Sequence, residues 1–105
     1  MSFDKVKQAT VELFNTNIEP FKEIVSKDVH CESIHKSSFG SSVKNYDEMM
    51  EMVEDAMSNW TGEHEIKCLI DTPEVVVKTV NGFDLDFTYL EIDHLKDGKI
   101  IKHFY

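Results

Sequence analysis

Apolar residues recur at helical spacing in three stretches of the first sixty residues. The first stretch follows Ser2, which suits a helix N-cap, and the second begins at Pro20, which a first helical turn tolerates. The third follows Asn45, which stands three residues before a glutamate, the spacing of a capping box. Its apolar stripe extends to Trp60, and a glycine two residues later ends the helix. The stripe positions are Phe3, Val6, Thr10, Leu13, Phe14, Phe21, Ile24, Val25, Tyr46, Met49, Met50, Val53, Met57 and Trp60.

Alternation of apolar and polar residues, which is typical of strands, replaces the helical pattern over residues 28–35 and again after the third helix. The later strands are expected over residues 63–71, 75–80, 83–95 and 99–105. Asn81-Gly82 and Asp97-Gly98 are expected to form tight two-residue turns, the first of which pairs Val80 with Phe83. Helices followed by an antiparallel meander indicate an α+β fold with the helices on one face of the sheet.

The second turn also predicts which residues of the last hairpin share a face. Counting outward from it pairs Asp93 with Lys102 and Glu91 with Phe104. With Tyr89, they would lie on the face that is rich in large aromatic residues, which we expect to meet the helices. The opposite face is apolar at one end and suits a homodimer interface. Its apolar residues are Leu90, Ile92, Ile101 and Tyr105.

Two carboxylates, Glu91 and Asp93, interrupt the face expected to be buried, about 7 Å apart along one strand. In a partly dry cavity they would raise each other's pKa, and one could then act as a general acid. A second interpretation pairs Asp93 with Lys102 across the hairpin and leaves Glu91 at the solvent-facing rim. We take Glu91 and Asp93 as the candidate catalytic residues. The candidate ligand-binding residues are Tyr89, Trp60, His30, Glu32, Lys102 and Phe104.

The composition restricts the partners. The net charge of −9 argues against binding to nucleic acid or to an anionic membrane. All 11 basic residues are lysine, so no guanidinium can bind a phosphate in a bidentate manner. No apolar run approaches the roughly 20 residues that span a bilayer, and the first residues lead into a helix rather than a signal peptide. We therefore expect a cytoplasmic protein that binds neither nucleic acid nor a membrane.

A chain of 105 residues is long enough for one domain, which we expect to cover residues 1–105. Cys31 and Cys68 fit no zinc-binding spacing and are expected to be reduced thiols in the core. His94 and His103 would be diagonal neighbours on one face, but two ligands without a third do not define a metal site. The sequence therefore predicts neither a metal nor a cofactor.

Two segments, taken with the order of the elements, carry a family resemblance. They are Asp28-Val-His-Cys-Glu32, after the second helix, and residues 90–104, with Lys-Asp-Gly-Lys-Ile in the hairpin. In these features the chain resembles the nuclear transport factor 2-like superfamily. Within it, the chain is most similar to the SnoaL-like polyketide cyclase and ketosteroid isomerase group. The resemblance implies a cystatin-like, cone-shaped α+β barrel, with three N-terminal helices packed on a curved antiparallel sheet around a pocket, and commonly a homodimer.

The resemblance also suggests roles for single residues. In ketosteroid isomerases an aspartic acid on the penultimate strand donates a hydrogen bond to the substrate oxyanion. Ile92-Asp93-His94 resembles that motif, and the shorter hairpin of this chain shifts the match to Glu91. The family's general base would fall near Glu32 or Ser33, neither of which is a clean match. Its tyrosine on the first helix would fall near Ala9 or Thr10, so this chain lacks it.

Two functions remain as alternatives. The first is a small-molecule pocket protein, an acid/base isomerase, cyclase or hydratase, that uses Glu91 or Asp93 on an apolar ligand. The second is a non-catalytic, dimeric interaction domain. An enclosed cavity with a carboxylate at its base favours the first function, whereas two solvent-exposed carboxylates argue against it. The site has to decide, because fold analogy alone does not establish an activity.

Overall fold

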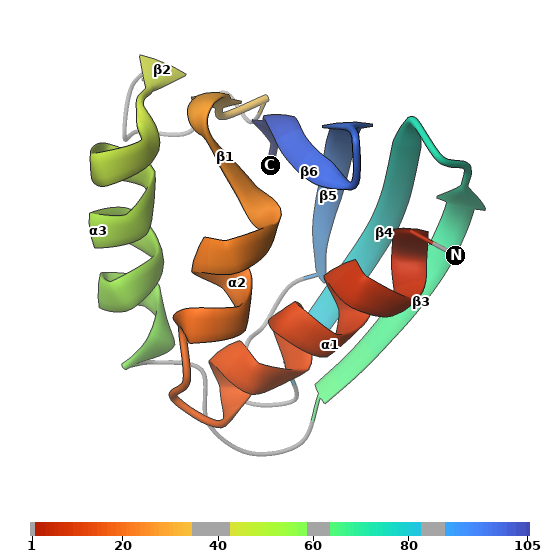
Figure 1. Ribbon diagram of the computed structural model, residues 1–105. Coiled ribbons are helices and arrows are strands. Elements are labelled where there is room, and N and C mark those ends of the chain that lie inside the picture. The colour runs from red at the N-terminus through yellow and green to blue at the C-terminus, as the bar shows by residue number, and fades with distance from the viewer. Residues whose placement is uncertain (1, 35–42, 59–63, 83–87) are drawn as a thin grey trace.

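The computed structural model describes residues 2–34, 43–58, 64–82 and 88–105. In these ranges three helices cover one face of a six-stranded sheet (Figure 1). The helices are α1 (Ser2–Phe14), α2 (Glu19–Ile24) and α3 (Tyr46–Met57). The strands are β1 (Val25–Glu32), β2 (Val43–Lys44), β3 (His64–Asp71), β4 (Val75–Gly82), β5 (Thr88–Lys96) and β6 (Lys99–Phe104).

The strands follow the order β2-β1-β6-β5-β4-β3 across the sheet. All neighbours are antiparallel except β1 and β6, which run parallel. The parallel pair arises because the chain passes through β2, α3 and the meander between these strands, and parallel neighbours require such a crossover. The α+β prediction is therefore confirmed, but the sheet is mixed rather than purely antiparallel.

The apolar stripes predicted for the helices face the sheet and form the core. In α1, Val6, Ala9 and Leu13 are buried, and α3 contributes Met49, Met50 and Val53. The capping box at the start of α3 is confirmed: the Asn45 side chain accepts from the Glu48 N–H at 2.9 Å, and the Glu48 carboxylate accepts from the Asn45 N–H at 3.0 Å. The sheet completes the core with residues of β1, β4, β5 and β6. They are Val25, Val29, Cys31, Val76, Leu95 and Ile100.

The two predicted turns differ in outcome. Asp97 and Gly98 have φ angles of +53° and +79° and connect β5 to β6, as predicted. The predicted turn at Asn81-Gly82 is wrong, because both residues belong to β4 and Asn81 pairs with Thr88. Val80 consequently pairs with Tyr89, and its predicted partner Phe83 lies outside the described residues. The register moves by an even number of residues, so β4 and β5 keep the predicted faces.

A bulge in the last hairpin changes the faces of β6. Next to the turn, Leu95 pairs with Ile100 as predicted, but His94 pairs with Lys102. Ile101 is thus an extra residue on β6, with no partner in the register on β5. An extra residue reverses the in–out alternation of every position beyond it, because side chains alternate with a period of two.

The bulge corrects two predicted pairs. Asp93 pairs with His103, not with Lys102, and Glu91 does not pair with Phe104, whose partner is Ile92. His103 is consequently buried on the face that meets the helices, whereas Lys102 is exposed. The prediction that Lys102 and Phe104 share the face of Glu91 is therefore wrong.

The cysteine prediction is confirmed for one residue only. Both cysteines are free, and Cys31 is fully buried, but Cys68 is exposed. Cys68 lies on the edge strand β3, where residues 67–70 are all exposed. None of the helices in the described ranges combines the length and the apolar character needed to cross a membrane.

Candidate functional site

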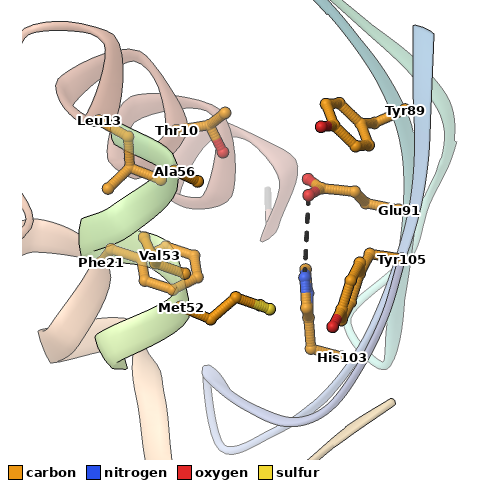
Figure 2. A pocket seen from close by; sticks show the side chains of 10 residues that line it. All are labelled: Thr10, Leu13, Phe21, Met52, Val53, Ala56, Tyr89, Glu91, His103 and Tyr105. Carbon is orange, nitrogen blue, oxygen red and sulfur yellow. Dashed lines mark ion pairs between the residues drawn. The ribbon is translucent and has the colours of Figure 1, made fainter. Parts of the chain in front are cut away.

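A cavity of about 160 Å³ lies between the helices and the C-terminal strands (Figure 2). Helices α1, α2 and α3 supply the apolar wall, and β5, β6 and the C-terminal residue supply the polar wall, so one end of the cavity differs in chemistry from the other. The lining residues are Thr10, Leu13, Phe21, Met52, Val53, Ala56, Tyr89, Glu91, His103 and Tyr105.

Behind the polar wall, a buried lysine joins the two carboxylates of β5. The Lys78 ammonium, 1% exposed, donates to Glu91 Oε1 at 2.8 Å and to Asp93 Oδ2 at 3.2 Å. Strand β4 places it there because Lys78 is the register partner of Glu91, on the same face as Asp93. Asp93 is fully buried, and only 13% of the Glu91 side chain is exposed. A buried cation between two carboxylates satisfies charges that would otherwise be costly to remove from water.

His103 connects the buried carboxylate to the cavity. Its Nδ1–H donates to Asp93 Oδ1, and its Nε2 lies 3.8 Å from Glu91 Oε2 (Figure 2). Two aromatic rings hold the imidazole in place. Phe21 meets it edge-on at 6.4 Å between ring centroids, and Tyr105 stacks on it at 5.8 Å. His103 Nε2 and Glu91 Oε2 are therefore oriented toward each other at the polar end of the cavity.

The ionisation of this cluster follows from burial and its charged partners. Burial raises the pKa of Asp93, but Lys78 and His103 outweigh it and lower that pKa to about 2. Burial opposes the charged forms of Lys78 and His103, yet the carboxylates, chiefly Asp93, raise both pKa values above their ordinary range. Because ionised Asp93 can only accept hydrogen bonds, His103 Nδ1 carries the proton in either charge state.

Of the eight residues predicted for the site, two line the cavity, namely Tyr89 and Glu91. Burial is the main cause that raises the pKa of the Tyr89 phenol, and the charge of Glu91 raises it further. Asp93 lies behind the cavity wall and contacts Lys78 and His103 rather than the cavity. It can therefore orient His103 without meeting a ligand.

Four predicted residues lie away from the cavity. His30 and Glu32 form an ion pair of 2.9 Å whose side chains are 42% and 40% exposed, and the Phe104 ring lies 6.1 Å from His30. Lys102 is exposed and pairs in register with His30. None of these four residues lines the cavity. Trp60, the remaining candidate, is outside the described residues.

Besides the six cavity-lining residues of the helices, the sequence interpretation missed two residues at the polar end of the site and misplaced a third. Tyr105 was assigned to the dimer face, but it lines the cavity. His103 was missed because the bulge at Ile101 reverses its face. The consecutive apolar pair Ile100-Ile101 was the available signal, since two adjacent apolar residues in an alternating strand indicate a change of face. Lys78 was a signal for a buried charge, because it shares its face of an alternating strand with Val76 and Val80, two residues away on either side.

In the part of the chain that the structure describes, no group of three or more His, Cys, Asp or Glu side chains is arranged to hold a metal ion. The polar end of the cavity is built from an imidazole, a carboxylate and two phenols. These groups can donate, accept and transfer protons without further components.

Solved structures with this architecture are numerous, although no protein-family model and no curated protein matches the sequence. IdmH from Streptomyces antibioticus, described as a "putative polyketide cyclase", has a TM-score of 0.71 at 10% identity, over 99% of this chain and 89% of that chain. An NTF2-like protein of unknown function from Cytophaga hutchinsonii has a TM-score of 0.68 at 13% identity, over 99% and 87% of the two chains. A second "putative polyketide cyclase", from Sinorhizobium meliloti, has a TM-score of 0.64 at 14% identity, over 99% and 97%.

These likenesses establish the class to which the fold belongs. A curved sheet with N-terminal helices on its concave side is the cone-shaped NTF2-like fold, which the sequence resemblance implied. At identities of 10–14% the likeness concerns the fold alone, and the chemistry has to be argued from the residues of this chain.

Replacing Lys78 with methionine should lower the free energy of unfolding by about 3–5 kcal/mol, because it leaves Asp93 and Glu91 as uncompensated buried charges. Urea denaturation measures this loss. Lys67→Met is the matched control, since the Lys67 side chain is 67% exposed and its loss should change stability by no more than about 0.5 kcal/mol. Equal, small effects of both substitutions would contradict a buried Lys78 cluster.

The free energy of unfolding should fall as the pH rises from about 5.5 to 9, because the raised pKa of folded His103 stabilises the protein most below the unfolded value of about 6.5. This contribution is lost as the pH passes the folded-state pKa. The charged and titratable groups around His103 are Asp93, Lys78, Glu91 and Tyr105. Asp93 and Lys78 keep their charges over this pH range, and Tyr105 stacks on the imidazole ring. Urea denaturation across the range should show a smaller dependence of the unfolding free energy on pH for His103→Gln than for the wild type, and an equal dependence would contradict the contribution of His103.

Proposed function

We propose that the protein binds a small, mainly apolar molecule in the cavity and catalyses a proton transfer on it with Glu91 and His103. The observation that carries the proposal is the pair Glu91 Oε2 and His103 Nε2, 3.8 Å apart at the polar end of an otherwise apolar cavity. Two proton-carrying groups within reach of one bound molecule form the arrangement that acid/base catalysis requires.

Each group has a partner that holds it in a suitable geometry. Lys78 fixes Glu91 through Oε1 and leaves Oε2 facing His103. Asp93 accepts from His103 Nδ1 and so directs Nε2 toward Glu91 and the cavity. Supporting residues of this kind fix the orientation of catalytic groups before a ligand arrives, which reduces the reorganisation needed during the reaction.

A proton transfer next to a carbonyl group illustrates the chemistry that this pair can perform. The Glu91 carboxylate takes a proton from the carbon beside the carbonyl, and the electron pair of that C–H bond forms the new C=C bond. The C=O π electrons move to the oxygen, which receives the Nε2 proton of His103. The product is an enol, with protonated Glu91 and neutral His103. Return of a proton to a different carbon completes an isomerisation and restores both residues.

Deuterium exchange tests this activity without knowledge of the natural substrate. In D₂O, the protein should accelerate exchange at the carbons beside the carbonyl of cyclohexanone, measured by proton NMR. Glu91→Gln should reduce the acceleration at least about 100-fold, since general-base catalysis contributes roughly that factor or more. Glu65→Gln removes a carboxylate that is 55% exposed on β3 and should leave the rate unchanged.

Two outcomes of the deuterium-exchange experiment would contradict the proposed activity. A rate equal to that of buffer, with all variants folded, would contradict a carbon-acid reaction. An accelerated rate that survives Glu91→Gln would contradict the role of Glu91. His103→Gln should lower the rate less completely and remove the dependence on pH that titration of His103 contributes, because Glu91 remains as the base while the titrating acid is lost.

A second proposal concerns the opposite face of the sheet and a second copy of this chain. Leu90 and Ile92 on β5 lie beside Val75 and Val77 on β4, and all four are only half-buried. The described helices cover the other face of the sheet (Figure 1). An apolar sheet face of this kind suits association between copies. The dimer would leave the cavity free, so the two proposals are compatible.

Analytical ultracentrifugation tests the dimer. The wild type should sediment as a dimer at micromolar concentration, and Ile92→Lys should sediment as a monomer, because it places a charge in the apolar contact. Val43→Lys, at a residue 59% exposed on β2, is the control and should remain dimeric. A monomeric wild type would contradict this proposal.

A further inference from the structure

We propose that the ligand of the cavity is a neutral, oxygen-bearing molecule about the size of a single six-membered ring. The inference rests on the proposed function and specifies its substrate class. It excludes polycyclic molecules and carboxylate or ammonium compounds as ligands of the cavity in its observed form.

The volume of the cavity sets the size of the ligand. At about 160 Å³ it is close to the apolar cavity of about 150 Å³ that binds benzene in another protein. Sites for larger, drug-sized molecules occupy about 300–1,000 Å³. A single ring with one or two substituents fits the observed space, whereas a second fused ring requires the walls to move.

Part of the helical wall resists that movement because it belongs to the core. Thr10, Leu13 and Phe21 are 2%, 3% and 4% exposed, and Val53 is 7% exposed. The Thr10 hydroxyl is also fixed by a 2.8 Å hydrogen bond to the carbonyl of Val6. Forcing an additional ring against tightly packed side chains costs free energy in the way that overpacking does. Met52 is unbranched, flexible and only partly buried, so it is the wall side chain that moves most easily and therefore limits the size of the ligand.

The charges at the polar end select a neutral ligand. Lys78 and protonated His103 carry two positive charges, which balance the two negative charges of Asp93 and Glu91. A ligand carboxylate would add an unbalanced negative charge beside Glu91, and an ammonium group would add a positive charge beside His103. In a site largely removed from water, either addition is costly.

The polar end nevertheless requires a hydrogen-bonding atom from the ligand. The gap of 3.8 Å between Glu91 Oε2 and His103 Nε2 is too long for a direct hydrogen bond, so both atoms keep bonding capacity. A carbonyl oxygen can accept from His103 Nε2–H while an adjacent C–H or O–H group lies near Glu91. Cyclic ketones and enones of one ring combine this chemistry with the apolar surface that the helices offer.

A size series of neutral ketones tests the inference by NMR titration of backbone amide shifts. Cyclohex-2-enone should bind the wild type with shifts at residues around the cavity. The fused two-ring ketone 1-tetralone should bind at least about tenfold more weakly, and the four-ring ketone progesterone should not bind in the cavity. Cyclohexanecarboxylate, a charged molecule of one ring, should also bind at least about tenfold more weakly than cyclohex-2-enone.

Variants of the wall should move the size limit in both directions. Met52→Ala enlarges the cavity and should bring 1-tetralone binding to within about threefold of cyclohex-2-enone binding. Ala56→Leu fills the cavity and should abolish cyclohex-2-enone binding, which keeps the test valid if Met52→Ala fails to fold. Glu51→Ala, on the exposed side of α3, should leave all affinities unchanged.

The outcomes separate this inference from the proposed function. Equal or tighter binding of 1-tetralone, progesterone or cyclohexanecarboxylate to the wild type would overturn the substrate class but leave a ligand-binding cavity in place. Absence of cavity shifts with every compound would overturn both the substrate class and the proposed function. Deuterium exchange into cyclohexanone with no exchange into 1-tetralone would support both.

Discussion

The polar end of the cavity depends on one interaction, the placement of the Lys78 ammonium between Glu91 and Asp93. Two carboxylates two residues apart on one strand would repel each other in a poorly hydrated core, and at least one of them would become protonated or turn toward water. With Lys78 in place each carboxylate has a buried cationic partner that orients it. Asp93 can then fix His103, and Glu91 can present one oxygen to the cavity. The helices depend on this indirectly, because their apolar side chains close over a polar cluster whose charges are balanced.

A local irregularity of the backbone supplies the second catalytic group. Without the extra residue at Ile101, His103 would face away from the helices and Lys102 would face the carboxylates. The cluster would then hold two lysines and no imidazole. The bulge thus converts a purely structural ion-pair cluster into one with an imidazole at the cavity wall. This fits the general observation that bulges occur beside active sites, where they redirect a side chain.

The sequence was sufficient for features that depend on local patterns. The amphipathic stripes predicted α1 and α3, the Asn45 capping box predicted the start of α3, and Asp97-Gly98 predicted the last hairpin. The placement of Glu91 and Asp93 on one face was also predicted correctly, since an even shift of register leaves the faces of β4 and β5 unchanged, whereas their burial had remained open. The sequence was insufficient where one residue changes the outcome. The bulge moved His103 onto the face that meets the helices and moved the predicted site residues Lys102 and Phe104 off that face. The parallel β1–β6 pair and the cavity volume depend on tertiary packing, which has no local signature.

The most direct test of the account is the imidazole pKa of His103, measured by ¹⁵N-resolved NMR titration in the wild type and in Asp93→Asn. The account predicts a wild-type pKa above the ordinary value of about 6.5, because the buried carboxylates favour the imidazolium. It predicts a lower pKa in Asp93→Asn, because the substitution removes the main charge that stabilises this form. A wild-type pKa at or below the ordinary value, or no change on substitution of Asp93, would contradict the coupled cluster on which the proposed chemistry rests.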